Sequence, residues 1–293
     1  LQEDGISVFL SPYYKGPVMA SCPVVLTIHD LFFIGYPGQR RPAYDALMTG
    51  LGKLYARRAS AIIADSEYSK RSIMSQLGVG ADKITVIPVA LGRDFCPRTL
   101  APSDSAKYGL RSPYILYVGN FKPHKNIPRL LEAYAALPAS LREVYQLVLA
   151  GSDEEHRPGL DKLANQLGVG NRVVFPGLIA DEDLSAIYSG CALFVLPSLY
   201  EGFGLPALEA MACGAAVAAA NRTAIPEVVD QAALLFDPEQ VGEMTRVIQR
   251  GITETGLREQ LRNRGLARAR VFSQGRTSGL VLDLLQQVVR QAA

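Results

Sequence analysis

The chain has 293 residues, of which 48% are hydrophobic and 20% are charged, and its formal net charge is +2. That length suits two domains better than one, and the composition is ordinary for a globular protein. The charges of the 30 basic and 28 acidic side chains nearly cancel, which argues against nucleic acid as a partner. The sequence contains no run of about 18 apolar residues, so no membrane span is predicted.

The four cysteines, at positions 22, 96, 191 and 213, are not spaced as metal ligands. None forms a C-x-x-C pair, and with only three histidines in the chain a zinc site is not expected. Near the C-terminus, arginines gather in a helix-like stretch, for which we expect a solvated helix face, the alternative being contact with an anionic membrane surface. They are Arg258, Arg262, Arg264, Arg268 and Arg270.

The first third of the chain alternates short β-branched runs with stretches of helical period. Strands are predicted at residues 6–10, 24–28, 61–64 and 84–87. Helices are predicted at 43–59 and 66–77, the second with Ser66 as its N-cap. Strands that alternate with helices in this way indicate βα units and a parallel sheet.

A longer series of the same kind follows a break in the pattern. Between residues 92 and 112, Pro97, Pro102 and a Ser-Asp-Ser cluster predict a connector. Beyond it, strands are predicted at 114–118, 146–149, 173–175, 192–196, 215–218 and 234–236, with helices at 127–136, 158–167, 182–189 and 206–212. Nearly continuous apolar strands are typical of a parallel sheet covered on both faces, so we predict a doubly wound α/β domain.

Together these patterns predict two Rossmann-like domains that face each other across a cleft, the first cut short at its N-terminus. The predicted organisation is a partial N-terminal domain at 1–96, a linker at 97–112, a second domain at 113–273 and a C-terminal helix at 274–293. The sequence opens with Leu1-Gln2-Glu3-Asp4, which is neither an initiator methionine nor a targeting segment, so we expect a longer parent chain.

A basic loop headed by glycine follows the strand predicted at 114–118. In an open α/β sheet, the loops at the carboxyl ends of strands form the ligand crevice, and a lysine beside a helix N-terminus can neutralise phosphate charge. On spacing alone, a solvated basic turn explains this loop equally well. Its polar and small residues are Gly119, Asn120, Lys122, His124 and Lys125.

A glycine-rich loop joins the strand at 192–196 to the helix at 206–212, and it includes Ser198. Gly202 and Gly204 let backbone N–H groups approach a ligand, and the helix dipole favours a diphosphate at that N-terminus. Glu201 and Glu209, at E-x7-E spacing, suit sugar and ribose hydroxyls because a carboxylate accepts several O–H bonds. The alternative is two structural glutamates, one in the loop and one in the helix.

Gly202, Gly204 and Ala207 also match the G-x-G-x-x-A pattern of a dinucleotide site. That pattern belongs to the first βα unit of its domain, whereas this loop is a late one and contains Pro206. We therefore set the dinucleotide interpretation aside.

Two other segments end predicted strands in the first third of the chain. His29 and Asp30 follow the strand at 24–28, which places His29 to face an interdomain cleft, although a lone histidine is more often structural. Ser66 follows the strand at 61–64 and is most simply explained as a helix cap.

In this order, the four segments resemble the retaining glycosyltransferases of family four, which have the GT-B fold. The resemblance covers nearly the whole chain and is most specific at 119–126 and 201–211, while the segment 224–229 also fits it. Many bacterial members with these features are similar to mannosyltransferases of surface-polysaccharide assembly.

The resemblance implies a role for each residue singled out above. Lys125 would bind the donor diphosphate and stabilise it as it leaves. Glu201 would contact the hydroxyls of the transferred sugar, Glu209 would hold the ribose, and His29 would face the sugar near the reacting carbon. The predicted catalytic residues are thus His29, Glu201 and Lys125. The predicted donor site comprises Gly119, Asn120, Lys122, His124, Lys125, Ser198, Glu201, Gly202, Phe203, Gly204, Leu205 and Glu209.

The same resemblance implies transfer of a hexose, with mannose favoured, from a GDP- or UDP-sugar to a glycan or lipid-linked acceptor. No metal and no cofactor are expected, because Lys125 and the helix dipole would take the place of a metal. A cytoplasmic protein is implied, with peripheral contact at the inner membrane face as an extension. The alternative is a nucleotide-sugar-binding fragment or relative without transfer activity.

Overall fold

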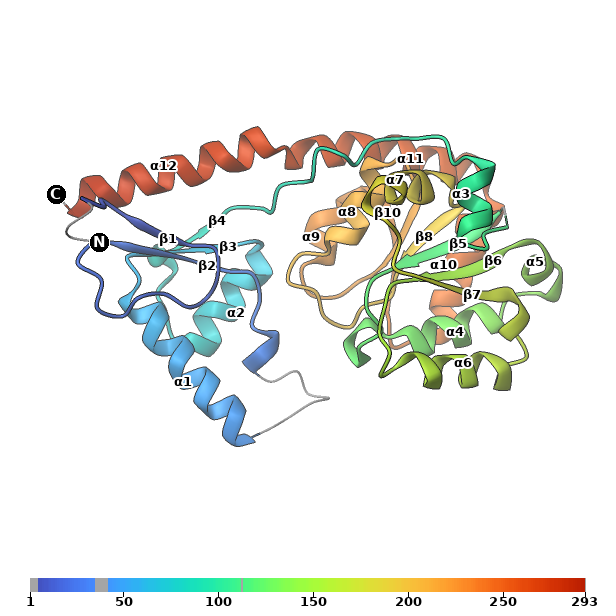
Figure 1. Cartoon of the computed structure of the whole chain (residues 1–293), viewed down its shortest axis with the longest axis horizontal. Coiled ribbons are helices and arrows are strands. Elements are labelled where there is room, and N and C mark those ends of the chain that lie inside the picture. The colour runs from blue at the N-terminus through green and yellow to red at the C-terminus, as the bar shows by residue number, and fades with distance from the viewer. Residues whose placement is uncertain (1–4, 35–41, 112, 293) are drawn as a thin grey trace. The chain divides into compact units, whose positions relative to one another are not determined.

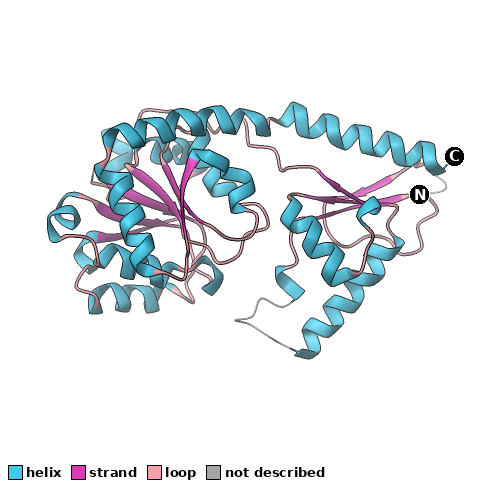
Figure 2. Cartoon of the chain, turned by 180° about the vertical axis from the view of Figure 1, so that it is seen from behind, coloured by secondary structure: helices cyan, strands magenta, loops and turns pink. Residues whose placement is uncertain are grey.

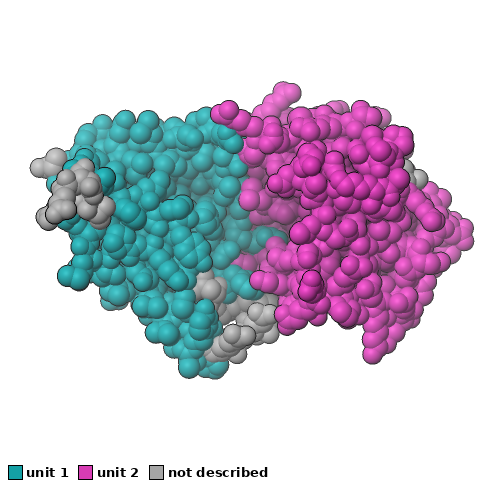
Figure 3. Space-filling view, viewed as in Figure 1, with its two compact units in different colours: residues 1–90, 201–203, 272–293 teal, residues 91–200, 204–271 magenta. Residues whose placement is uncertain are grey.

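The computed structural model describes residues 5–34, 42–111 and 113–292. They form two compact units, which Figure 3 shows in different colours. Unit 1 contains residues 1–90, 201–203 and 272–293, and unit 2 contains residues 91–200 and 204–271. Within the described ranges, no helix is both long enough and apolar enough to cross a membrane.

Unit 1 is built on a sheet of four parallel strands in the order β1-β2-β3-β4. The sheet (Figure 1) consists of β1 (Phe9–Ser11), β2 (Val24–Ile28), β3 (Ala61–Ala64) and β4 (Ile84–Val86), and the helices are α1 (Pro42–Arg58), α2 (Glu67–Leu77) and α12 (Gln274–Ala292). Side chains alternate between the two faces of each strand. One face packs on α1 and α2, and the other, through Val25 and Ile63, packs on Leu284 and Val288 of α12.

Unit 2 is a six-stranded parallel sheet in the order β10-β9-β8-β5-β6-β7. Its strands are β5 (Tyr114–Val118), β6 (Gln146–Ala150), β7 (Val173–Gly177), β8 (Leu193–Leu196), β9 (Val217–Ala220) and β10 (Ala233–Phe236). Its helices are α3 (Pro102–Lys107), α4 (Ile127–Ala135), α5 (Ala139–Val144), α6 (Arg157–Gln166), α7 (Asp181–Gly190), α8 (Leu205–Ala212), α9 (Ile225–Val229), α10 (Val241–Thr253) and α11 (Thr255–Ala269).

Helices cover both faces of this sheet (Figure 2), which explains why its strands read as continuous apolar runs. On one face α4 packs against α6 and α10, and on the other α8 packs against α7 and α11. In the two units, short 3-10 helices are also present at Phe32–Ile34, Ala81–Lys83, Pro123–Lys125, Gly170–Arg172, Asp230–Ala232 and Arg270–Phe272.

The strand order of unit 2 creates a topological switch point between β5 and β8. The chain leaves β5 in one direction, through β6 to β7, and then returns to place β8 on the other side of β5. The loops that follow β5 and β8 therefore leave toward opposite faces of the sheet, at the position where open α/β sheets bind their ligands. Both sequence motifs singled out above lie in those two loops.

The predicted α/β class with two parallel sheets is confirmed. Each predicted strand is present, although β1 begins three residues later than the strand predicted at 6–10 and β9 is shifted two residues toward the C-terminus. The sequence analysis missed α3, α5 and α9. These helices have only 6, 6 and 5 residues, too few to show a helical period.

The arginine cluster on α11 bonds to backbone carbonyls. Arg262 donates from Nε to Gly214 O at 2.6 Å, and Arg268 donates from Nε to Val228 O at 2.9 Å. Both carbonyls lie at or just beyond the last turn of a neighbouring helix, where backbone acceptors lack intrahelical partners. These two guanidinium groups therefore act within unit 2 rather than as a purely solvated face.

We expect Arg262→Met to lower the free energy of unfolding by about 1–3 kcal/mol, because carbonyls that it serves in a partly buried site lose their donor. Urea unfolding measures the change. Arg264→Met is the matched control, since Arg264 is exposed and its one hydrogen bond within the described residues is a long one, 3.4 Å, to Gln231 O. Equal stability of the two variants would contradict this account of the cluster.

Candidate functional site

The loop after β5 is shaped by its own backbone and by one buried tyrosine. Gly119 has a φ of 152°, and the carbonyl of this residue lies so close to Gly151 that a Cβ there would meet it at 1.8 Å. The hydroxyl of Tyr117 donates to Asn120 O at 2.6 Å, which folds the loop over the end of its strand. The 3-10 turn Pro123–Lys125 then leads into α4.

Asn126 ties this loop to two others. Its side chain is buried, with 3% exposed, and its Nδ2 donates to Pro197 O at 3.1 Å and to Pro238 O at 2.8 Å. Pro197 follows β8 and Pro238 follows β10, so one amide links three loops at the carboxyl edge of the sheet. A further bond, from Leu199 N to His124 O at 2.8 Å, joins the first two loops directly.

The basic residues of the first loop differ in charge. His124 is buried, and its pKa is lowered to about 4, first by burial and then by Lys125 and Lys122. It is therefore neutral near pH 7. Lys122 is exposed and Lys125 is half-buried, so these two lysines carry the positive charge of the loop.

The loop after β8 ends at the N-terminus of α8. Gly204 is the N-cap residue, with a φ of 98° that favours glycine, and Leu205 and Pro206 begin the helix. Ser198 lies in this loop and is fully buried. The first backbone N–H groups of a helix have no intrahelical partner and point outward, which is the arrangement that binds an anion.

Glu209 lies on α8, about one turn after the start of the helix, and is half-buried. Its Oε2 accepts a hydrogen bond of 2.9 Å from the hydroxyl of Tyr188 on α7. Burial raises the pKa of this carboxyl, and the bond from Tyr188 opposes that shift.

Residues 201–203 belong to unit 1, where Gly202 fits against the end of β2. A Cβ at Gly202 would meet His29 O at 2.6 Å and Asp30 Cβ at 2.8 Å. The carbonyl of Gly202 lies within hydrogen-bond distance of two buried hydroxyls, Ser66 Oγ at 3.1 Å and Ser69 Oγ at 3.2 Å. Phe203 packs edge-on against Phe272, with ring centroids 5.6 Å apart.

The predicted cap at Ser66 is confirmed, since its Oγ accepts from Ser69 N at 3.0 Å. Ser66 caps α2 and Ser69 lies in its first turn, and the hydroxyls of both residues also contact the carbonyl of Gly202. The sequence analysis assigned only the first of these roles, because the second depends on a contact across more than 130 residues of chain.

His29 is paired with an aspartate that the sequence analysis did not assign to the site. Its Nδ1 lies 2.8 Å from Asp65 Oδ2, and its Nε2 lies 3.2 Å from Pro12 O. Asp65 is nearly buried, whereas half of the His29 side chain is exposed. The pKa of His29 is raised, chiefly by the bond to Asp65, and burial opposes the rise.

Asp30 adds a second carboxyl beside this pair. Burial raises its pKa most strongly, and the nearby charges of Glu201 and Asp65 raise it further, while Phe32 N donates to its Oδ1 at 3.0 Å. The signal that could have indicated these aspartates is their position, because Asp30 and Asp65 each follow a strand of the same parallel sheet.

The predicted site residues thus form two groups, each within one unit. Unit 1 places His29 beside Glu201 and Gly202, with Phe203 next in the chain. Unit 2 contains the rest on the loops after β5 and β8 and on α8, namely Gly119, Asn120, Lys122, His124, Lys125, Ser198, Gly204, Leu205 and Glu209.

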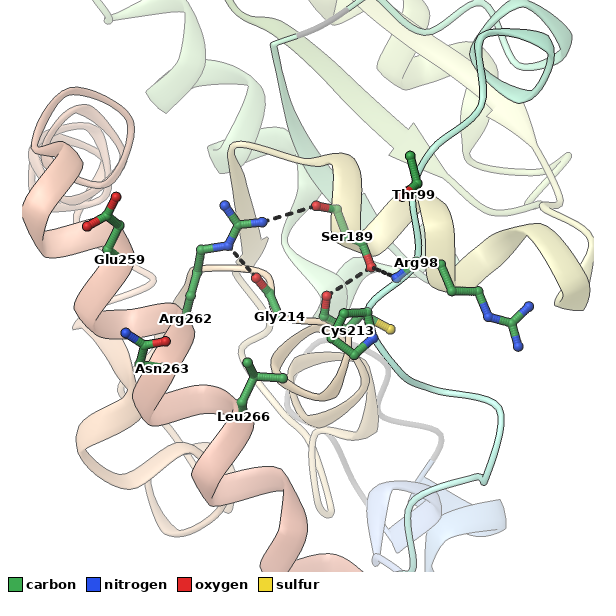
Figure 4. Close-up of a pocket in the computed structure, with 10 residues that line it drawn as sticks. Arg98, Thr99, Ser189, Cys213, Gly214, Glu259, Arg262, Asn263 and Leu266 are labelled. Atoms are coloured by element: carbon green, nitrogen blue, oxygen red, sulfur yellow. Dashed lines mark hydrogen bonds between the residues drawn. The ribbon is translucent and has the colours of Figure 1, made fainter.

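A cavity of about 520 Å³ in unit 2 shares no residue with these loops (Figure 4). It is lined by the segment 97–99, the ends of α7 and α8, and one side of α11. Its polar groups already serve one another: Arg262 donates to Gly214 O and Ser189 O, and Arg98 N donates to Ser189 Oγ. This pattern indicates a structural junction between elements.

We expect Asn126→Ala to lower the free energy of unfolding by about 2 kcal/mol or more, because the Pro197 and Pro238 carbonyls lose their donor. Asn126 also has a φ of 60°, which alanine tolerates poorly. Asn126→Gly restores the backbone freedom but not the hydrogen bonds, so it should recover about 1 kcal/mol of the loss. Urea unfolding of both variants separates the contribution of the hydrogen bonds from that of the backbone conformation. Wild-type stability in both variants would contradict the stabilising role of the Asn126 hydrogen bonds.

We expect Asp65→Asn to lower the pKa of His29 markedly, because the carboxylate is the main cause of its rise. Histidine NMR titration measures it, with Asp30→Asn as the control that lowers the pKa less. The stability that the protonated pair contributes is present below the ordinary histidine pKa and is lost as pH rises through the raised one. An unchanged His29 pKa in Asp65→Asn would contradict the pairing.

Comparison with known proteins agrees with this architecture. Residues 102–268 match the model of the glycosyl transferases group 1, and residues 7–91 match that of Glycosyltransferase Family 4. The chain is 35% identical over 232 residues to the serotype-specific mannosyltransferase WbdA of Escherichia coli, covering 77% of this chain and 28% of that protein. It is 38% identical over 218 residues to the O-antigen chain mannosyltransferase B of Escherichia coli, covering 73% and 57%. The chain therefore spans between about a quarter and three-fifths of the length of these relatives.

Solved structures share the fold. Sucrose-phosphate synthase from Thermosynechococcus elongatus superposes with a TM-score of 0.82 at 26% identity, covering 98% of this chain and 75% of that one. Anabaena HepE in complex with UDP superposes with a TM-score of 0.82 at 22% identity, covering 98% and 80%. Two parallel sheets, two motif loops at a switch point and these matches establish that the chain belongs to the group 1 glycosyltransferases of family four, with the GT-B fold.

Proposed function

We propose that this protein transfers a hexose, with retention of anomeric configuration, from a nucleoside diphosphate sugar to a glycan or lipid-linked acceptor. The observation that carries the proposal is that the loops after β5 and β8 are joined at the switch point of the sheet, the place where open α/β sheets bind ligands. Leu199 N donates to His124 O at 2.8 Å, which joins the loop that carries Lys122 and Lys125 to the loop that leads into the N-terminus of α8.

The donor diphosphate is the part of the substrate that these two loops suit best. Backbone N–H groups at the start of α8 and the ammonium groups of Lys122 and Lys125 supply positive potential without a metal ion. Because His124 is neutral, Lys122 and not His124 shares the phosphate charge with Lys125. This charge is most valuable as the diphosphate leaves, when negative charge grows on its bridging oxygen.

In the transfer step, the bond from the anomeric carbon to the phosphate oxygen breaks while a bond to the acceptor oxygen forms on the same face. The acceptor's proton passes to an oxygen of the leaving diphosphate. His29, whose ring Asp65 orients and whose pKa Asp65 raises, forms a hydrogen bond with a hydroxyl of the sugar. Glu201 accepts hydrogen bonds from further sugar hydroxyls.

Mannose is the favoured sugar because the relatives of highest identity reported above are named mannosyltransferases. Those names describe the relatives, and both GDP- and UDP-sugars suit a proposed site whose contacts are mainly with the diphosphate. The acceptor is inferred by the same likeness to be a growing glycan or a lipid-linked one.

The test is an assay of donor turnover with GDP-mannose and UDP-glucose, in the presence of a chelator. We expect one donor to be consumed, by transfer or slow hydrolysis, and Lys125→Ala to lower kcat/KM by about 100-fold or more through loss of charge stabilisation. Lys162→Ala, an exposed lysine on α6, is the control and should match the wild type.

Wild-type turnover in Lys125→Ala would refute the assigned diphosphate site. Tight nucleotide binding with no turnover of either donor, when glycan and lipid-linked acceptors are supplied, would instead favour the alternative of a nucleotide-sugar-binding protein without transfer activity.

A further inference from the structure

The phenol of Tyr188 is the one buried polar group in direct contact with Glu209 among the described residues. Tyr188 is fully buried on α7, and its ring packs edge-on against Phe194, with centroids 5.5 Å apart, and against Phe95 at 6.2 Å. These contacts hold the ring in one orientation, with its hydroxyl 2.9 Å from Glu209 Oε2. The aromatic packing therefore fixes the direction from which Glu209 receives its hydrogen bond.

The direction of this hydrogen bond is also fixed. Burial and the neighbouring carboxylate raise the pKa of Tyr188 well above its ordinary value, so the phenol keeps its proton. Tyr188 is therefore the donor and Glu209 the acceptor. The bond occupies one carboxylate oxygen, and in the part of the chain that the structure describes no hydrogen bond reaches Oε1.

We propose that Tyr188 is a positioning residue for the nucleotide donor: by holding Oε2 of Glu209, it presents Oε1 to the ribose hydroxyls. The inference rests on the proposed function, in which Glu209 binds the ribose. A glutamate that must be ordered when the ligand arrives loses side-chain entropy at that moment, whereas a glutamate already held by Tyr188 does not.

The same contact sets the charge of Glu209. A carboxylate accepts two ribose hydroxyls, whereas its protonated form has lost part of that capacity. Burial favours the protonated form, and the phenol of Tyr188 favours the carboxylate. Among the described residues, the only other titratable group seen to interact with Glu209 is the thiol of Cys213, which stays neutral because burial raises its pKa to about 12.

Calorimetric titration with GDP and UDP tests the inference. Each nucleotide is compared with its 2′,3′-dideoxy analogue, which keeps the base and diphosphate but lacks the ribose hydroxyls. We expect Tyr188→Phe to weaken binding of the complete nucleotide about three- to tenfold and to leave the dideoxy analogue nearly unaffected. The preference for the ribose hydroxyls therefore shrinks.

The pH dependence gives an independent readout. Removing the phenol raises the pKa of Glu209 further, so the acid limb of nucleotide affinity moves to higher pH in Tyr188→Phe. In Glu209→Gln, whose amide oxygen still accepts from Tyr188, that limb disappears. This second variant keeps the inference testable should Tyr188→Phe not fold.

Tyr114→Phe is the matched control. Tyr114 is equally buried in unit 2, and its hydroxyl donates to Ile187 O at 2.6 Å, away from Glu209. This variant loses a buried hydroxyl but should keep both the ribose preference and the acid limb.

Two failures are distinguishable. If the wild type binds a nucleotide and Tyr188→Phe weakens it and its dideoxy analogue equally, with no shift of the acid limb, the inference is overturned and the proposed function stands. If the wild type binds neither GDP nor UDP, the proposed function falls and this inference with it.

Discussion

The hydrogen bonds of Asn126 are the constraint on which the proposed donor site depends. Parallel strands deliver their loops to one edge of the sheet, but nothing in strand pairing fixes how those loops lie against one another. Asn126 does so by donating to the carbonyls that follow β8 and β10 while itself heading α4. Buried amides are costly unless satisfied, so this arrangement is maintained by the penalty of breaking it.

In the proposed function, that constraint orders the loop that carries Lys122 and Lys125 before the donor arrives. A loop that the ligand had to order would lose conformational entropy at every binding event, whereas a loop already held in place does not. Burial of His124 within the same loop lowers its pKa and keeps its ring neutral, so it adds no third positive charge.

The sequence was sufficient for the α/β fold, and its strand patterns located every strand among the described residues. The glycine, lysine and glutamate spacings singled out two loops that the structure joins, and their role as a donor site belongs to the proposed function. The sequence was insufficient where the candidate site depends on pairing between distant segments. Asp65 meets His29 across 36 residues, and Ser66 meets Gly202 across 136. No local pattern encodes such contacts, since they arise only when neighbouring strands bring their ends to one edge.

The arginines of α11 show how a charge pattern in the sequence can lead to an incomplete prediction. Five basic residues in one helical stretch suggest a solvated or membrane-facing surface, because charge pattern is visible in sequence while acceptors are not. The structure supplies the acceptors, as carbonyls at the ends of neighbouring helices. A guanidinium group with its planar set of donors is well suited to that role, and Arg262 and Arg268 brace unit 2, whereas Arg264 and Arg270 are exposed.

Hydrogen–deuterium exchange with saturating GDP and with saturating UDP tests the central claim most directly, because it reports every backbone amide without assuming a site. The account predicts that one nucleotide slows exchange in segments 119–126 and 198–208, which follow β5 and β8. Slowed exchange confined to segments 97–99 and 259–266, around the separate cavity of unit 2, would contradict it.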